Sequence, residues 1–230
     1  MTRARIRLLL FPAFLLAAAG CGGQRPSAVT VKGSDTMVIL GQRWAENYMA
    51  EHPGATVQVT GGGSGTGIAA LINGTTEIAN SSRPIKSDEQ GRVRARFSLL
   101  AAETPVAKDG VALYANESNG VTQLTVAQLR AIYQGDVTSW KAVGGADAPI
   151  VLYSRENSSG TYVFFKDNVL KGEDFAASAQ TLPGTAAVVN AVSREKNGIG
   201  YGGAAYAKGV KEIKVVGEDG QADAPSAENG

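Results

Sequence analysis

The sequence predicts an α/β protein built from two lobes. Short β-branched or apolar runs alternate with helix-length segments over residues 28–216, an order typical of largely parallel sheets flanked by helices. The alternation starts again near Lys108, and this restart predicts a second lobe. Apolar residues make up 43% of the 230 residues, so the chain can bury the core of one ordinary domain or two small ones.

Three short alternating or β-branched runs predict the strands of the first lobe: 28–32, 55–60 and 77–80. Leu40, Trp44 and Tyr48 recur every four residues and predict the apolar face of a helix after the first strand. A second, short helix is expected from Ile68, behind a glycine-rich loop. Residues 87–90 have the pattern of a capping box and predict the start of a third helix.

After the restart near Lys108, four more strands are expected: 110–116, 149–154, 199–201 and 212–216. Thr125 and Gln128 form another capping box, which predicts a helix with Leu129, Ile132 and Tyr133 on its apolar face. Two further helices are expected: 162–170 and 186–196. The Asn197-Gly198 pair stops the last of them.

Residues 1–20 have the pattern of a secretory signal. Three arginines precede an apolar run that is too short to cross a bilayer as a helix. The small residues before Cys21 resemble a bacterial lipobox, which implies acylation of Cys21 and a place in the periplasm or on the outer face of the cell membrane. A plain secretory signal, with Cys21 incidental, is the alternative. Residues 21–27 have linker composition and would tether the domain to its lipid.

The composition excludes several classes of function. One cysteine and one histidine nearly exclude a zinc site, a disulfide framework and most histidine-dependent catalysis, and we expect no cofactor. Three of the 22 basic residues lie in the signal, and 21 residues are acidic, so the remaining chain is slightly acidic. We therefore expect no nucleic-acid partner, and any bound anion must be held by local geometry.

Polar corners recur where a predicted strand runs into a helix. Three are clear and a fourth is weaker: Gly33-Ser34-Asp35-Thr36, Gly63-Ser64-Gly65-Thr66-Gly67, Ser158-Ser159-Gly160-Thr161 and, weaker, Ser81-Ser82. Each helix start exposes free N–H groups and the positive end of a dipole, and glycine lets an oxyanion approach the backbone. Each corner alone reads as an ordinary helix cap. Together, around Arg155, they predict a site for a small tetrahedral oxyanion.

In their order and spacing, these corners resemble those of the periplasmic phosphate-binding proteins of phosphate ABC importers. Two further stretches carry the resemblance: Ser81-Ser82-Arg83-Pro84 and Asn197-Gly198-Ile199-Gly200-Tyr201. It implies the two-lobed type II periplasmic-binding fold, with one lobe of residues 28–106 plus 203–230 and the other of 107–202. It also implies hinge strands near 104–108 and 201–205, a phosphate ion in the interlobe cleft, an ABC permease as partner, and no enzyme activity. We expect a monomer.

The resemblance also implies the residues that bind phosphate. From the first lobe they are Ser34, Asp35, Thr36, Met37, Ser64, Gly65 and Ser82, and from the second Arg155, Ser159, Gly160 and Thr161. Ser82 stands where many relatives have an aspartate, which can accept the proton of HPO4²⁻ and repel sulfate. Asp35 either replaces that carboxylate or is an acid favoured by a helix N-terminus. Arg83 is either a second cation of the site or, as we favour, half of an ion pair within its lobe.

Other readings remain open. Sulfate, molybdate or another oxyanion could be the ligand, and a surface lipoprotein could keep the fold without a ligand. A phosphoester-acting enzyme would need a metal cluster, a paired nucleophile and base, or a P-loop, and the sequence offers none of these. Residues 218–230 have loop composition, and relatives continue past such a loop with a strand and a helix. We therefore expect a partial chain.

Overall fold

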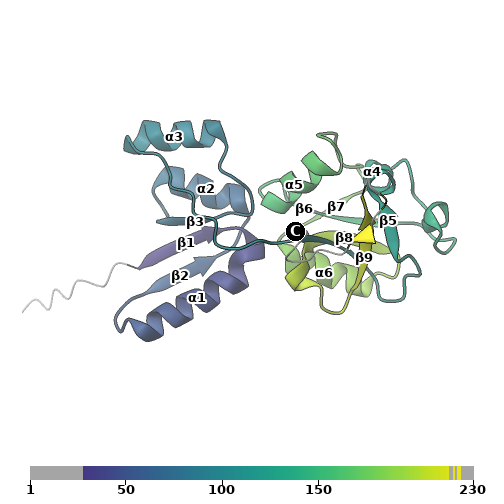
Figure 1. Cartoon of the computed structure of the whole chain (residues 1–230), viewed down its shortest axis with the longest axis horizontal. Helices are drawn as coiled ribbons and strands as arrows, with labels where there is room; N and C mark the ends of the chain where they lie inside the picture. Colours follow the sequence, from purple (N-terminus) through teal and green to yellow (C-terminus); the bar gives the residue numbers. More distant parts are fainter. Residues whose placement is uncertain (1–27, 218–219, 221, 224–230) are drawn as a thin grey trace, which may run out of the picture.

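The computed structural model describes residues 28–217, 220 and 222–223. It places them in two lobes that lie side by side (Figure 1), as the sequence predicts. The signal segment, Cys21 and the linker 21–27 lie outside the described residues. Among the helices that are described, none is both long and apolar enough to cross a membrane.

The first lobe is a parallel sheet of three strands in the order β2-β1-β3, with two helices packed against the sheet and a third packed on one of them. Its strands are β1 (Val29–Gly33), β2 (Val57–Thr60) and β3 (Ile78–Asn80). Its helices are the 3-10 turn η1 (Asp35–Met37), α1 (Val38–Glu51), α2 (Ser64–Asn73) and α3 (Ser87–Phe97). All the predicted elements are present, but α2 begins at Ser64 rather than Ile68.

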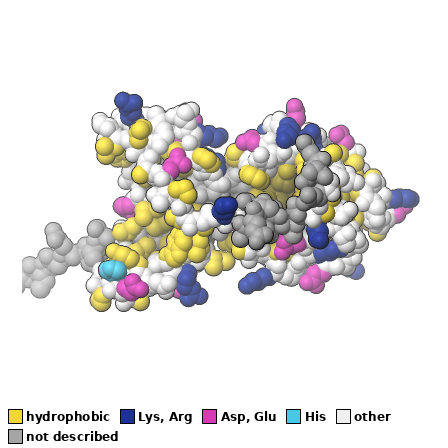
Figure 2. Space-filling view, viewed as in Figure 1, with side chains coloured by type: hydrophobic (Ala, Val, Ile, Leu, Met, Phe, Trp, Pro, Cys, Tyr) yellow, Lys and Arg dark blue, Asp and Glu magenta, His cyan; other side chains and the backbone are white. Residues whose placement is uncertain are grey.

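Helix α1 does not bury the apolar face that its sequence predicts. Leu40, Trp44 and Tyr48 are 37%, 43% and 50% exposed, whereas Gly41 and Ala45 are buried. A Cβ atom at Gly41 would lie only 3.3 Å from the Cγ1 of Val59, so small residues set this close approach to the sheet. Figure 2 shows hydrophobic side chains gathered over this part of the first lobe.

The second lobe is built on a mixed sheet in the order β10-β9-β4-β8-β6-β7, with β5 beside β9. The strands are β4 (Val111–Ala115), β5 (Gln123–Thr125), β6 (Val151–Arg155), β7 (Gln180–Leu182), β8 (Gly198–Gly203), β9 (Lys211–Val216) and β10 (Ala222–Asp223). Strand β6 is parallel to β7 and β8, whereas β4 is antiparallel to β8 and β9. The short strands β5, β7 and β10 carry no signal that we recognised in the sequence.

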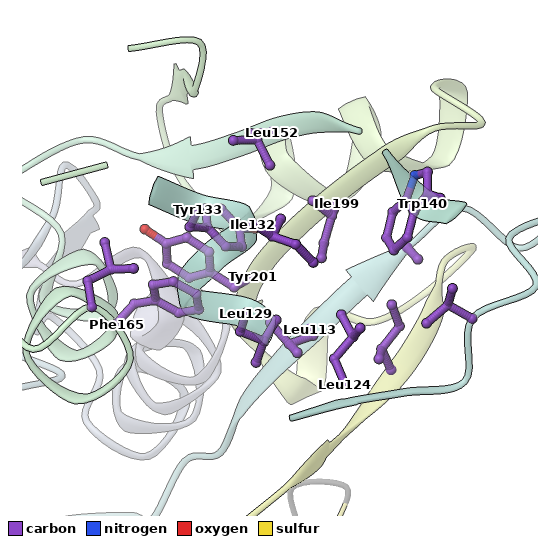
Figure 3. Packing of buried hydrophobic residues seen from close by; sticks show 14 residues of the cluster. Leu113, Leu124, Leu129, Ile132, Tyr133, Trp140, Leu152, Phe165, Ile199 and Tyr201 are labelled. Carbon is purple, nitrogen blue, oxygen red and sulfur yellow. The ribbon is translucent and has the colours of Figure 1, made fainter. Parts of the chain in front are cut away.

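The helices of the second lobe cover both faces of this sheet. They are α4 (Val126–Gln134), η2 (Trp140–Val143), α5 (Gly160–Asn168), α6 (Thr185–Arg194) and η3 (Ala204–Tyr206). Alternate residues of β4 face opposite sides, so Leu113 joins the cluster under α4 and α5 (Figure 3) and Tyr114 joins the cluster under α6. Phe165 of α5 stacks on Tyr201 of β8 in the first cluster, with 4.0 Å between ring centroids.

The division into lobes differs from the expected one. Residues 203–230 were expected in the first lobe, but β9 pairs with β4 of the second, and Ile213 is buried in the second-lobe core. Residues 201–203 belong to β8 and form no crossing strand, and no strand forms at 104–108. Within the described residues, the chain passes between the lobes once, between α3 and β4 (Figure 1).

Candidate functional site

The predicted polar corners lie at the carboxyl ends of their strands, the usual ligand-binding edge of an open α/β sheet. The first lobe contributes Ser34, Asp35 and Thr36 after β1, Ser64 and Gly65 after β2, and Ser82 after β3. The second contributes Arg155 at the end of β6 and Ser159, Gly160 and Thr161 at the start of α5. Five of these side chains are almost fully buried: Ser34, Ser64, Arg155, Ser159 and Thr161.

The starts of α2 and α5 meet where the two lobes touch. The N–H of Gly65 donates to the carbonyl of Ser158 over 2.8 Å, and the Ser158 hydroxyl donates to the carbonyl of Gly62 over 3.2 Å. A Cβ atom at Gly160 would collide with the hydroxyl oxygens of Ser64, at 2.6 Å, and of Ser82. Only glycine therefore allows this approach of α5 to the first lobe.

Four side-chain hydroxyl groups of the first lobe form two hydrogen-bonded pairs. Ser64 Oγ lies 3.2 Å from Ser82 Oγ and also accepts the N–H of Ser82 over 3.1 Å. Ser34 Oγ lies 2.8 Å from Thr36 Oγ1. In the second lobe, Ser159 Oγ instead accepts the N–H of Tyr162 over 3.2 Å, so that side chain acts as the helix cap of α5.

Arg155 is the buried cation of this interface, with its side chain 1% exposed. Its Nη1 donates to Thr185 Oγ1 over 2.8 Å, and its Nη2 donates to Asp35 Oδ2 over 2.9 Å and to Glu156 Oε1 over 3.3 Å. Its Nε is buried and has no hydrogen-bond partner among the described residues. Since a buried donor without a partner is costly, this N–H suits an acceptor of a bound ligand.

Asp35 links the two lobes through both its side chain and its backbone. Its Oδ2 pairs with Arg155, and its Oδ1 accepts the N–H of Gly62 over 2.9 Å. Its carbonyl oxygen accepts the hydroxyl of Tyr206, from the second lobe, over 2.7 Å. Asp35 is therefore an ion-pair partner of Arg155 as well as an acid at the start of a helix.

Three residues around Arg155 and Asp35 were missed by sequence reasoning: Glu156, Thr185 and Tyr206. Thr185 had a usable signal, because Gly184-Thr185 opens α6 after β7 and repeats the glycine–hydroxyl corner. Glu156 directly follows Arg155, but neither it nor Tyr206 repeats that corner pattern, and only the folded chain brings Tyr206 to Asp35.

Met37 and Arg83 differ from the other predicted residues. Met37 ends η1 and caps α1. Arg83 donates two hydrogen bonds to Glu89, over 2.8 and 2.7 Å, so it is the ion-pair residue that we favoured. The hydrogen bond from Arg83 holds the pKa of the Glu89 carboxyl below its ordinary value, although burial opposes this shift.

The interface combines helix N-termini, hydroxyl groups and one arginine, a set that can bind an anion without changing it chemically. The described part of the chain has no group of three or more His, Cys, Asp or Glu residues that could hold a metal ion. Two α/β lobes that enclose such a set define a bilobal solute-binding protein.

Comparison with known proteins agrees with this class. Residues 22–228 match the PBP superfamily domain. The phosphate-binding protein PstS of Pseudomonas aeruginosa is 33% identical over 218 residues, and that of Staphylococcus aureus is 33% identical over 201. These matches include 89% and 84% of this chain but only 66% and 61% of the two relatives, so the chain spans less than two thirds of their lengths.

Two solved structures are similar in fold and in sequence. A putative phosphate ABC transporter substrate-binding protein from Clostridium perfringens, with bound phosphate, matches with a TM-score of 0.76 and 33% identity, over 82% of this chain and 75% of that one. An ABC-type phosphate transport receptor from Vibrio cholerae matches with a TM-score of 0.61 and 32% identity, over 82% and 76%. The chain therefore belongs to the PBP superfamily, in its branch of PstS-like phosphate-binding proteins.

Proposed function

We propose that this protein captures inorganic phosphate outside the cytoplasmic membrane and delivers it to the permease of an ABC importer. The observation that carries the proposal is the meeting of Arg155, with its unpartnered Nε, and the buried hydroxyl groups of both lobes at one interface. The residues proposed to bind phosphate are those that the resemblance implies, with Met37 contributing at most its backbone. Relatives that are named for phosphate binding or phosphate transport support it.

The charges around Arg155 favour an anion that carries a proton. Asp35 and Glu156 both contact the guanidinium, so a bound dianion would face two carboxylates. HPO4²⁻ can donate its proton to a carboxylate oxygen, because each such oxygen accepts more than one hydrogen bond. Sulfate has no proton to donate at neutral pH and would be repelled. We propose that Asp35 supplies this discrimination in place of an acid at Ser82.

The Asp35→Asn variant tests this role. The amide has no negative charge and can donate a hydrogen bond, so it should weaken phosphate binding and improve sulfate binding. We expect the ratio of the two dissociation constants, measured by calorimetric titration, to move toward one. A variant that keeps the full preference for phosphate would exclude Asp35 as the discriminating group, and Asp88→Asn, at an exposed surface ion pair, is the matched control.

The proposed function itself is tested by titrating the delipidated protein with phosphate, sulfate and molybdate. We expect heat and a rise in melting temperature with phosphate alone. A preference for another oxyanion would change the substrate, and no ligand-induced rise with any of the three would favour a scaffold lipoprotein. Turnover of a chromogenic phosphoester would contradict the proposal that the protein is not an enzyme.

The proposed location rests on the first 21 residues. We propose that a lipid on Cys21 anchors a monomer at the outer face of the membrane. Expression with a labelled fatty acid should label the parent and not the Cys21→Ser variant, and only the parent should sediment with membranes. Label on both proteins, or on neither, would favour a plain secretory signal.

A further inference from the structure

We propose that Tyr206 is a positioning residue: it holds η1 of the first lobe in place from the second lobe, and through Asp35 it orients the anion site. This inference rests on the proposed function. Tyr206 has no place in the set of ligands that the sequence predicts. Its hydroxyl donates to the carbonyl of Asp35 over 2.7 Å, and Asp35 Oδ2 in turn accepts from Arg155.

Tyr206 belongs to a corner of the second lobe that is itself firmly held. The hydroxyl of Tyr114 donates to the carbonyl of Gly203, and the N–H of Ala204 donates to the carbonyl of Gly110 over 2.9 Å. Both bonds tie the corner to β4 or to the residue just before it. The segment that carries Tyr206 is therefore held by hydrogen bonds to the sheet of the second lobe.

The same corner lies close to η1. A Cβ atom added at Gly203 would come within 3.5 Å of Thr36 Cγ2, so the two lobes approach each other closely here. Asp35 and Thr36 are consecutive in η1, so the bond to the Asp35 carbonyl fixes both the carboxylate and the neighbouring hydroxyl. The ordinary pKa of a tyrosine hydroxyl is 10.0, and burial raises that of Tyr206 further, so the group is protonated and can donate at neutral pH.

The contact joins different lobes and so favours the conformation in which they touch. A ligand that binds this conformation has an apparent dissociation constant that increases as the population of the conformation falls. Tyr206→Phe removes one hydrogen bond between neutral groups and keeps the ring. We expect it to raise the dissociation constant for phosphate about three- to tenfold.

The experiment compares the parent, Tyr206→Phe and Tyr48→Phe. Tyr48 is a half-exposed tyrosine of α1 that stacks on His52, so it controls for loss of a hydroxyl group. Two quantities are measured: the dissociation constant for phosphate, and amide hydrogen exchange of residues 34–38 without phosphate. Tyr206→Phe should raise both, and Tyr48→Phe neither. A purely structural role would lower the melting temperature and leave both unchanged relative to the parent.

A double variant tests whether Tyr206 acts through the Asp35 side chain. In an Asp35→Ala background, Tyr206→Phe should cost less in phosphate affinity than it does in the parent. An equal cost in both backgrounds would overturn the proposal. Failure of the parent to bind phosphate would refute the proposed function instead. Amide hydrogen exchange of residues 34–38 would then be the test of the positioning role of Tyr206. Unchanged exchange in Tyr206→Phe would overturn the positioning role in that case.

Discussion

At the scale of single residues, Arg155 combines two features: a buried ion pair within the protein, and a buried N–H group that the described residues leave unpaired. It is buried, and its charge is compensated by Asp35 and Glu156 within its own fold. It also keeps one buried N–H group without a partner among the described residues. The planar guanidinium has five N–H donors that point in fixed directions. Such a group can donate hydrogen bonds to protein residues on one side and to a ligand on another.

Arg155→Ala should therefore be the most damaging single change for phosphate binding. By analogy with breaking a buried charge pair, we expect a loss of about 3–5 kcal/mol, or roughly two to four decades in affinity. Ser64→Ala removes one hydrogen bond to a charged group and should cost about 1.5–3 kcal/mol. Calorimetric titration of both variants with phosphate shows which one loses more affinity. Arg43→Ala, which changes an exposed arginine of α1, is the control. Parental affinity in Arg155→Ala would place the site elsewhere.

At the scale of elements, the capping box of α4 is the best local signal in the chain. Thr125 Oγ1 accepts the N–H of Gln128 over 3.1 Å, and Gln128 Oε1 accepts the N–H of Thr125 over 2.9 Å. Thr125→Ala should lower the free energy of unfolding by about 1 kcal/mol. Urea unfolding of the parent, this variant and Thr122→Ala, an exposed threonine just before β5, measures the loss. Equal losses in both variants would contradict the capping role.

The start of α3 should make stability depend on pH. Arg83 lowers the pKa of the Glu89 carboxyl in the folded state. Ionised Glu89 therefore stabilises the fold at pH values above its ordinary pKa of 4.5, and this contribution is lost as the pH falls below that value. Glu89→Gln should be less stable than the parent at pH 7 and should lose less stability between pH 5 and pH 3. Thermal unfolding across that range checks this prediction. Parallel pH curves would exclude Glu89 as a source of the dependence.

Local signals predicted most of these elements, and long-range packing explains what they missed. The box at 87–90 was predicted one residue late, because Glu89 accepts the N–H of Lys86 and Ser87 is already helical. The alternation of β9 predicted a strand, but nothing in it showed that β4 would be its neighbour. Pairing is decided by which core a strand fills, and Ile213 fills that of the second lobe.

At the scale of the whole molecule, the sequence predicted which repeated corners meet at the interface, but not the residues that reach the interface from outside those corners. Ser64, Ser82 and Gly160 were predicted from strand–loop–helix corners, and the structure brings them into contact. The order of the corners carried the prediction, because each one alone is an ordinary cap. Tyr206 comes from a corner with no such pattern and meets Asp35 only because the two lobes dock.

The two lobes should close on phosphate. Within the described residues they are joined by one covalent connection, between α3 and β4, and by contacts such as Arg155 with Asp35. A phosphate ion that contacts both lobes stabilises the closed arrangement by the contacts it makes only there. Small-angle scattering should therefore show a smaller radius of gyration with saturating phosphate than without it. In Arg155→Ala the same phosphate concentration should produce little change. Identical dimensions of the parent with and without phosphate would mean that binding does not move the lobes, and the proposed permease would then have to recognise the bound ion in another way.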